Sequence, residues 1–418
     1  MKDILTTAAV SCIIIAGCNV SGRDRMKFDA PQKPEIVKDD FSRKDYDKYH
    51  QTIQAFMQEN LLRRSFNGAI LVAKNNTVLY ENYQGFADLR TKDSITEHTA
   101  FHIASTSKTF TAMAVLQLVQ EGRLTLTTTL DQFFPGFPYA GVTVKDLLSH
   151  RSGLPNYLYF LEKTGWDTQK KISNQEVLQS LINDKPNKDF EPNTRFSYSN
   201  TNFVLLALII EKITGQPYPS YMKTKIFEPL GMKDTYVYTE AEADRSTPSF
   251  KNNGRYWDLD FTDNTYGDKN IYSTPSDLLK WSLAVNEEKI IPRQLLDMAY
   301  TPYSNERKSI HNYGLGWRML NLQNGRKVIY HNGRWHGSNS AFAYLPEEKV
   351  TIIIVGNKYN SNIYSTARKA YDIFGNYLQT DKNDDEDDDP LVSNSPVRGK
   401  TVANSQVPGA AFNYTAGK

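Results

Sequence analysis

Ser105 and Lys108, three residues apart, form the pair with the clearest chemistry in this sequence. They precede an apolar run at 109–119 whose spacing predicts a helix that begins near Ser105. One helical turn places both side chains on the same face, where the lysine amine can take the proton of the serine hydroxyl. Burial lowers the pKa of a lysine and makes its neutral form accessible near neutral pH. The pair therefore predicts a serine nucleophile with a lysine base.

The same spacing occurs a second time, at Ser220 and Lys223, without catalytic residue types in its surroundings. One such pair is weak evidence, because a serine that caps a helix beside a solvated lysine has the same pattern. The interpretation of Ser105 therefore depends on what accompanies it elsewhere in the chain.

Tyr198 and Asn200 are the first candidates to accompany it. They follow a turn signal at 191–193 and precede an apolar helix at 203–210, which places them in a loop. A tyrosine beside a cationic lysine is expected to have a depressed pKa and to act as a general acid or base. A tyrosine that caps the next helix is the structural alternative.

The second candidate is the stretch 331–337, His-Asn-Gly-Arg-Trp-His-Gly. It is expected to end a strand at 327–331 and to turn into another strand at 338–345. Glycines at a strand edge allow close approach of a substrate backbone, and the N–H groups there can point at an oxyanion. A histidine and a glycine in an ordinary hairpin turn are the alternative.

Apolar periodicity places strands near both ends of the chain and short helices between them. The early elements are a helix at 45–64 and a β-hairpin at 68–73 and 77–81, and the helical region spans 123–310. The late elements are strands at 313–319, 327–331, 338–345 and 349–356, then a helix at 362–378. One sheet must therefore be assembled from both ends of the chain, with the helical segment inserted.

The 418 residues are 39% hydrophobic and 23% charged, which is typical of a globular protein with a large core. The net charge of +2 gives no reason to expect a nucleic-acid partner. The two cysteines, Cys12 and Cys18, lie near the N-terminus, so the folded part has neither a disulfide framework nor a cysteine-based metal site. The seven histidines show no metal-ligand spacing.

The N-terminal 18 residues are typical of an export signal. The sequence Ile15-Ala16-Gly17-Cys18 resembles the bacterial lipobox, in which the cysteine is lipidated. Asp3 weakens the positive charge of the signal, and an ordinary cleaved signal is the alternative. A lipid on Cys18 implies a membrane partner and a location in a bacterial cell envelope, as a periplasmic or outer-membrane lipoprotein.

The remaining chain divides into three parts by composition. Residues 19–44 are polar and predict a tether, residues 45–379 predict the folded domain, and residues 380–418 predict an acidic, disordered tail. Between Asp381 and Asp389 seven of nine residues are acidic, a pattern that a plain solvated tail explains.

In this order, the three candidate stretches resemble the serine β-lactamase and penicillin-binding-protein family. The likeness is to its class C-type branch, which includes D-alanyl-D-alanine carboxypeptidases and esterases. It extends over residues 68–376 and includes the phrases at 147–155, 226–232 and 313–317. The resemblance implies an α+β fold, in which helices and a mostly helical lobe flank an antiparallel sheet.

The resemblance also implies roles for individual residues. Ser105 is the implied nucleophile, Lys108 its basic partner, and Tyr198 the acid/base that passes the proton to the leaving group and later activates water. The implied substrate-binding residues are Asn200, His331, Asn332 and Gly333, and the implied oxyanion hole consists of the backbone N–H groups of Ser105 and Arg334.

The function that follows is an exported serine hydrolase that acts through an acyl-enzyme on an ester, peptide or amide bond. A class C-like β-lactamase, or a penicillin-binding sensor that acylates without turnover, is the alternative. His331 replaces the lysine of the β-lactamase motif Lys-Thr-Gly, which favours esters and small peptides or amides over penicillins. The expected partner is a small-molecule or peptide substrate. Neither a metal nor an organic cofactor is implied, and the oligomeric state stays open.

Overall fold

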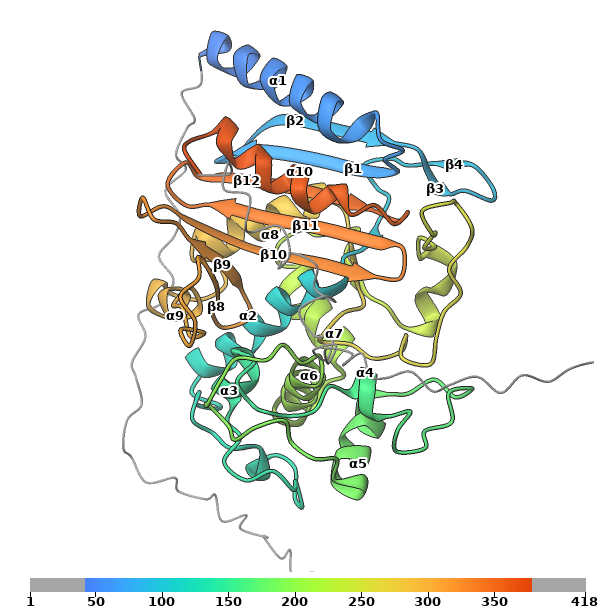
Figure 1. The fold of residues 1–418 in the computed structure, drawn as a ribbon, viewed down its shortest axis with the longest axis vertical. Helices are drawn as coiled ribbons and strands as arrows, with labels where there is room; N and C mark the ends of the chain where they lie inside the picture. Colours follow the sequence, from blue (N-terminus) through green and yellow to red (C-terminus); the bar gives the residue numbers. More distant parts are fainter. Residues whose placement is uncertain (1–41, 378–418) are drawn as a thin grey trace, which may run out of the picture.

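A computed structural model describes residues 42–377, and Figure 1 shows it as a ribbon. Its largest element is a seven-stranded antiparallel sheet in the order β2-β1-β12-β11-β10-β9-β8. The strands are β1 (Gly68–Lys74), β2 (Thr77–Gln84), β8 (His311–Tyr313), β9 (Arg318–Asn321), β10 (Lys327–Trp335), β11 (Ser338–Leu345) and β12 (Val350–Gly356). The first and last strands of the chain pair as β1 with β12, so the sheet is assembled from both ends as predicted.

Helices surround this sheet and form a separate lobe below it in Figure 1. They are α1 (Arg43–Met57), α2 (Ser107–Gln120), α3 (Val144–Leu148), α4 (Tyr157–Phe160), α5 (Asn174–Asp184), α6 (Thr201–Thr214), α7 (Tyr218–Met222), α8 (Pro275–Asn286), α9 (Arg293–Ala299) and α10 (Asn362–Ala370). Within residues 42–377, no helix has the length and apolar character needed to cross a membrane.

Two small sheets complete the described structure. One joins β3 (Phe86–Asp88) to β4 (Asp93–Ser94), and the other has the order β5 (Phe101–His102), β7 (Ile271–Ser273) and β6 (Tyr236–Val237). The second matters for function, because β5 leads directly into the segment that contains Ser105.

Alternate residues of the large sheet belong to two different hydrophobic cores. Ile70 of β1 and Ile354 of β12 pack with α1 and α10 on one face. Leu71 and Ile353 face the opposite way and join the core that contains α2, α6 and α8. Successive strand side chains point to opposite faces, so these buried strands supply both cores.

Local sequence signals explain several element boundaries. The side chain of Thr143 caps α3 and forms a reciprocal capping box with Asp146. Thr274 accepts a hydrogen bond from the backbone of Asp277 at the start of α8, and Gly215 ends α6 with a positive φ of 70°. These caps fix where α3 and α8 begin and where α6 ends.

Several predicted elements have other bounds in the structure, among them the helix predicted at 362–378, because α10 ends at Ala370. The single strand predicted at 313–319 is two short strands, β8 and β9, separated by a turn. The turn predicted at 331–337 is confined to residues 336–337, because β10 continues to Trp335. The helix α1 begins two residues before the predicted boundary at 45. The predicted export signal, Cys18, most of the tether and the acidic tail lie outside the described residues.

Candidate active site

Ser105 lies in a short 3-10 turn, Ala104–Thr106, that opens directly into α2. The sheet holds this turn, because the Thr106 hydroxyl donates to the His331 carbonyl at 3.1 Å. Ser340 Oγ of β11 donates to the carbonyl of Ile103 at 2.7 Å on the other side of the turn. Ala104 has a φ of 48°, a strained conformation for a residue with a Cβ. These contacts fix the Ser105 hydroxyl at the junction of sheet and lobe.

Gly333 of β10 is required by the close approach of the strand to this turn. A Cβ at position 333 would lie 2.3 Å from the Ile103 carbonyl oxygen and 2.9 Å from the Ser105 nitrogen. Real side chains do not tolerate such distances, so only glycine lets the strand pack against the nucleophile turn.

Lys108 is fully buried and connects three parts of the site. Its Nζ lies 3.0 Å from Ser105 Oγ, 2.8 Å from Asn200 Oδ1 and 2.7 Å from the Asp268 carbonyl oxygen. The pKa of Lys108 is lowered to about 7, chiefly by burial; the Asp268 carboxylate opposes the shift and the Arg318 guanidinium adds to it. The direction of this shift is the one expected of a lysine whose neutral form is accessible near neutral pH.

Tyr198 lies beside this lysine, in the loop that precedes α6. Lys108 Nζ is 5.0 Å from the centroid of the Tyr198 ring. The expectation of a depressed tyrosine pKa is wrong, because burial raises the pKa of Tyr198 while Arg318 and the Ser105 hydroxyl oppose the rise. No hydrogen bond of ordinary geometry to another described residue reaches the buried Tyr198 hydroxyl. At neutral pH the phenol is therefore protonated.

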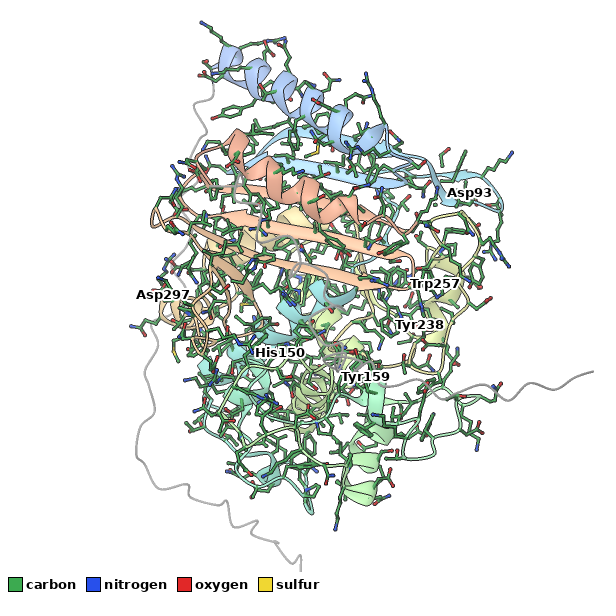
Figure 2. The ribbon with its side chains drawn as sticks, in the orientation of Figure 1. Asp93, His150, Tyr159, Tyr238, Trp257 and Asp297 are labelled. Carbon is green, nitrogen blue, oxygen red and sulfur yellow. The ribbon has the colours of Figure 1, made fainter. Side chains whose placement is uncertain are left out.

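His150 supports the Tyr198 loop from below the sheet, where Figure 2 labels it. Its ring centroid is 4.2 Å from that of Tyr198. The His150 Nδ1 accepts a hydrogen bond from the Ser199 backbone at 3.2 Å, and its carbonyl accepts one from the Ser197 backbone at 2.9 Å. Burial drives the pKa of His150 well below its ordinary value, so this ring is a neutral support.

His331 is fully buried behind Tyr198, at a distance of 6.4 Å between ring centroids. Its Nε2 lies 3.1 Å from the Tyr313 hydroxyl, and its Nδ1 lies 2.8 Å from the carbonyl of Asn332. Burial, with Arg318 and Lys108 adding to it, holds the pKa of His331 well below its ordinary value. The structure therefore places a neutral histidine near the nucleophile and not on the surface of the cavity.

The other predicted residues of β10 contribute in different ways. Strand alternation puts Asn332 and Arg334 on the face of Tyr330, opposite to the face of Ile329 that contacts the α2 core. The guanidinium of Arg334 lies 4.8 Å from the Tyr359 ring centroid. The structure thus does not bring the Asn332 and Arg334 side chains to Ser105. The part of Arg334 that can contribute to the site is its backbone N–H group.

The strand pairing of β10 changes at this point. Pairing with β9 ends at Tyr330, whereas pairing with β11 continues to Trp335. Trp335 and Ser338 flank a two-residue turn and form the hydrogen-bonded pair next to it. Because hydrogen-bonded and non-hydrogen-bonded pairs alternate along an antiparallel ladder, the next pair, Arg334 with Asn339, is non-hydrogen-bonded, and the N–H of Arg334 points away from β11. That direction is the one required of the second donor in the predicted oxyanion hole.

The small cavity beside Ser105 also contains residues that the sequence analysis missed. Asp268, Lys269 and Trp335 line it together with Ser105, Tyr198, Asn200 and Arg334. Lys269 is buried, with its Nζ 3.6 Å from Asp268 Oδ2 and 2.6 Å from the Tyr157 hydroxyl. Burial lowers the pKa of Lys269, and the Asp268 carboxylate opposes the shift.

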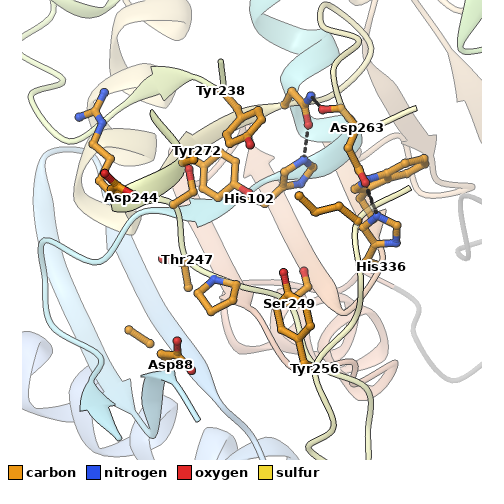
Figure 3. A pocket seen from close by; sticks show the side chains of 18 of the residues that line it. Asp88, His102, Tyr238, Asp244, Thr247, Ser249, Tyr256, Asp263, Tyr272 and His336 are labelled. Carbon is orange, nitrogen blue, oxygen red and sulfur yellow. Dashed lines mark hydrogen bonds and ion pairs between the residues drawn. The ribbon is translucent and has the colours of Figure 1, made fainter. Parts of the chain in front are cut away.

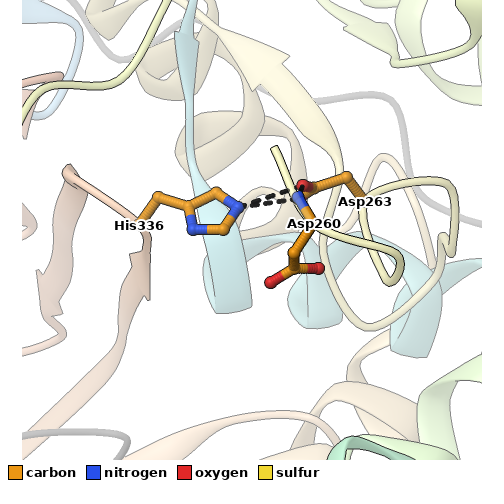
Figure 4. A group of neighbouring side chains, drawn as sticks. All are labelled: Asp260, Asp263 and His336. Atoms are coloured by element: carbon orange, nitrogen blue, oxygen red, sulfur yellow. Dashed lines mark hydrogen bonds and ion pairs between the residues drawn. The ribbon is translucent and has the colours of Figure 1, made fainter. Parts of the chain in front are cut away.

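A second cluster lies at the tip of the β10–β11 hairpin, where Figure 4 shows Asp260, Asp263 and His336 converging. The Asp263 carboxylate accepts hydrogen bonds from Trp335 Nε1 at 2.5 Å and from His336 Nε2 at 3.0 Å. These bonds account for the cluster and tie the hairpin tip to the loop that precedes Asp268.

The comparisons with known proteins agree with this architecture. The Beta-lactamase family matches residues 50–374 of the chain. Penicillin-binding protein 4* of Bacillus subtilis is 31% identical over 322 residues, which span 73% of this chain and 71% of the relative.

Two solved structures extend the comparison. The octameric penicillin-binding protein homologue from Pyrococcus abyssi is similar with a TM-score of 0.66 and 26% identity, over 83% of this chain and 80% of its own. The D-amino acid amidase from Ochrobactrum anthropi is similar with a TM-score of 0.63 and 25% identity, over 78% of this chain and 97% of its own. Since the family match covers most of the chain, the protein belongs to the Beta-lactamase family and is a serine hydrolase of that family.

Proposed function

We propose that the protein forms an acyl-enzyme on Ser105, with Lys108 as the base, and cleaves ester, peptide or amide bonds in small substrates. The observation that supports this proposal is the set of three hydrogen-bond partners of Lys108 Nζ. Two of its three partners, Asn200 Oδ1 and the Asp268 carbonyl, can only accept hydrogen bonds. A neutral amine donates its two N–H groups to them, and its lone pair is left facing the Ser105 hydroxyl at 3.0 Å.

In the acylation step, Ser105 Oγ attacks the substrate carbonyl carbon while its proton moves to Lys108 Nζ. The carbonyl oxygen becomes an oxyanion between the N–H groups of Ser105 and Arg334. The bond to the leaving group then breaks, and the leaving group takes the phenol proton of Tyr198. Lys108 returns the proton of Ser105 to Tyr198, so both groups end in their starting state.

In the deacylation step, water attacks the acyl carbon and gives a proton to the neutral Lys108. The bond between the acyl group and Ser105 Oγ breaks, and Lys108 protonates that oxygen. The free acid leaves, and the enzyme returns to its resting form. Asn200 holds Lys108 through its carbonyl oxygen, so its amide nitrogen is the part that we assign to substrate.

The preference for esters and amides over penicillins is supported by the state of His331. A buried neutral ring stands where the β-lactamase motif has a lysine, and the Arg334 guanidinium lies over Tyr359 instead. A fixed cation from β10 for a penicillin carboxylate is therefore lacking. A structurally similar protein is a D-amino acid amidase, which supports amides as the substrate class.

Labelling with a serine-directed phosphonate tests the nucleophile. We expect Ser105→Ala and Lys108→Ala each to abolish labelling. Ser220→Ala and Lys223→Ala, which alter the second pair of the same spacing, serve as matched controls and should label like the parent. Labelling that survives in Ser105→Ala places the nucleophile elsewhere and refutes the mechanism.

Comparison of kcat/KM for a D-amino acid amide, a p-nitrophenyl ester and nitrocefin tests the substrate class. We expect the amide and ester to be turned over and nitrocefin to be the slowest. Intact mass after exposure to penicillin separates the alternatives. A stable acyl adduct with poor turnover of every substrate indicates a sensor, and fast nitrocefin turnover indicates a β-lactamase.

We also propose that the protein is exported and anchored in the cell envelope by a lipid on Cys18. The lipobox-like sequence Ile15–Cys18 and the following polar segment support this proposal. Cys18→Ser should move the protein from the membrane fraction to the soluble fraction without loss of hydrolase activity. Cys12→Ser is the matched control, and a Cys18→Ser variant that stays membrane-bound contradicts the anchor.

A further inference from the structure

The cavity at Ser105 is too small for an acyl group that carries a large side chain. Its volume is about 10 Å³, which is near the minimum that holds one water molecule. Its lining includes Ser105, Tyr198 and Asn200 together with Lys269 and Trp335. An acyl group with a side chain therefore needs space beyond this cavity.

A much larger cavity, of about 580 Å³, lies on the other side of Trp335, and Figure 3 shows its lining. Trp335 is the residue that lines both cavities. His102, Tyr238 and Tyr272 form one wall of the larger one, and Asp263 and His336 form the wall next to Trp335.

Trp335 is held in this position from both sides. Its Nε1 donates to Asp263 Oδ1 at 2.5 Å, and its ring centroid is 4.9 Å from that of His336 on the side of the larger cavity. The ammonium of Lys269 lies 4.5 Å from a Trp335 ring centroid on the side of Ser105. The indole is therefore a fixed partition between the nucleophile and the larger cavity.

The larger cavity is on the acyl side of the scissile bond. Trp335 directly follows Arg334, whose N–H we assign to the oxyanion, whereas Tyr198, which we assign to the leaving group, does not line the larger cavity. A substrate group that extends past Trp335 into the larger cavity thus belongs to the acyl part of the substrate, which is attached to the carbonyl carbon, and not to the leaving group.

The lining of the larger cavity fits a ring. The faces of Tyr238, Tyr256 and Tyr272 provide apolar surface, and their hydroxyls make no hydrogen bond to another described residue. The charged lining residues are Asp88, Asp93, Asp244, Asp263, Arg90 and Arg245. Because carboxylates outnumber guanidiniums, an uncharged or cationic ring is favoured over one that carries a carboxylate.

We propose that Trp335 determines acyl-group specificity: in place it limits the acyl group to small ones, and displaced it admits an uncharged or cationic ring into the larger cavity. This inference rests on the acyl-enzyme function proposed above.

The test compares kcat/KM for p-nitrophenyl acetate and p-nitrophenyl 3-phenylpropanoate, which share a leaving group and differ in the ring. Trp335→Ala should raise the ratio of phenylpropanoate to acetate by about tenfold or more, since the ring gains a hydrophobic site. Trp166→Ala, the same change at another half-buried tryptophan, is the matched control and should leave the ratio unchanged. Trp335→Leu serves if the alanine variant does not fold.

A second substitution locates the ring. Tyr256→Ala added to Trp335→Ala should reverse most of the gain, because Tyr256 lines only the larger cavity. An unchanged ratio in Trp335→Ala, or a gain that Tyr256→Ala leaves intact, overturns the inference. Ser105→Ala distinguishes this failure from failure of the proposed function, because hydrolysis of the acetate ester that survives Ser105→Ala refutes the acyl-enzyme itself.

Discussion

The proton affinity of Lys108 decides whether the Ser105 hydroxyl has a base at neutral pH. The pKa of Lys108 is lowered to about 7, chiefly by burial and also by Arg318, while Asp268 opposes the change. The lysine is thus about half neutral at pH 7. An ordinary surface lysine, with a pKa near 10.4, is almost fully protonated there.

This pKa predicts the pH profile of the enzyme. Only neutral Lys108 can accept the proton of Ser105, so kcat/KM should rise with pH, level off above about 7 and fall about tenfold per unit below it. Lys108→Arg should lose most of the activity, and the remaining kcat/KM should no longer rise with pH, because the guanidinium stays protonated. A parent profile that is flat between pH 5 and 8 contradicts this role for Lys108.

Tyr198 gives a second prediction, because burial keeps its phenol protonated. Tyr198→Phe removes the proton donor and should lower kcat/KM for an amide by about 10²–10⁴, the usual range for a general acid. A p-nitrophenyl ester should lose much less, because nitrophenolate leaves without protonation. Equal losses on the amide and the ester indicate that Tyr198 acts in positioning and not as the acid.

Sequence reasoning identified the residues whose chemistry is carried by a local pattern. Ser105 and Lys108 are one helical turn apart, and their contact follows from that spacing. Lys269 and Trp335 were missed because no local pattern marks them. They reach the site through contacts between segments far apart in the chain: Lys269 Nζ lies 2.6 Å from the Tyr157 hydroxyl and 4.5 Å from a Trp335 ring centroid.

At the level of elements, the end of the pairing between β10 and β9 is the feature that bears on catalysis. Pairing with β9 ends at Tyr330, so the N–H of Arg334 is not part of the ladder with β9. Proline is tolerated at such edge positions. Arg334→Pro therefore removes one oxyanion donor with limited damage to the sheet.

This substitution should lower kcat by about 10²–10³, the usual cost of one oxyanion donor. Arg334→Ala keeps the backbone N–H and removes only a side chain that lies over Tyr359. If the backbone N–H is the group that stabilises the oxyanion, the kcat of this variant should stay within about tenfold of that of the parent. Circular dichroism confirms that both variants fold. Similar kcat values for the proline and alanine variants exclude the Arg334 amide from the hole.

The extent of β10 shows why element boundaries were harder to predict than element types. The strand was expected to end at residue 331 and to turn before the next strand at 338. In the structure Gly333 lies within the strand, where the Ser105 turn leaves no room for a Cβ. A close approach between distant segments and a turn both require glycine, and the sequence pattern does not distinguish them.

At the level of the whole molecule, the sheet separates a supporting core from the core that contains the site. The core of α1 and α10 lies on one face, and α2 and α8 pack on the other. Predicting a sheet assembled from both ends succeeded, because buried strands have long apolar runs that are easy to recognise. The packing of the lobe was not predictable, since its short helices have caps but no pattern that specifies their neighbours.

This division predicts that stability and activity can be separated by the face that a substitution affects. Met57 of α1 is fully buried in the supporting core, whereas Phe110 of α2 stacks on Trp281 of α8 at 4.0 Å in the site core. Met57→Ala and Phe110→Ala should each lower the free energy of unfolding by about 2–5 kcal/mol, the usual cost of a cavity in a core. Thermal denaturation followed by circular dichroism measures this loss.

Activity should respond differently to the two changes. Phe110 lies two residues after Lys108 on the same helix, so its loss lets α2 shift and disturbs the distance of 3.0 Å between Lys108 Nζ and Ser105 Oγ. A misplacement of about 1 Å costs about 100-fold in rate. The kcat of Phe110→Ala should therefore be lower than that of the parent even at temperatures well below the melting temperature of the variant, where it is folded. Met57→Ala should retain the kcat of the parent there, since the sheet stands between Met57 and the site. If both variants lose kcat in proportion to stability, the two faces are coupled and the separation is wrong.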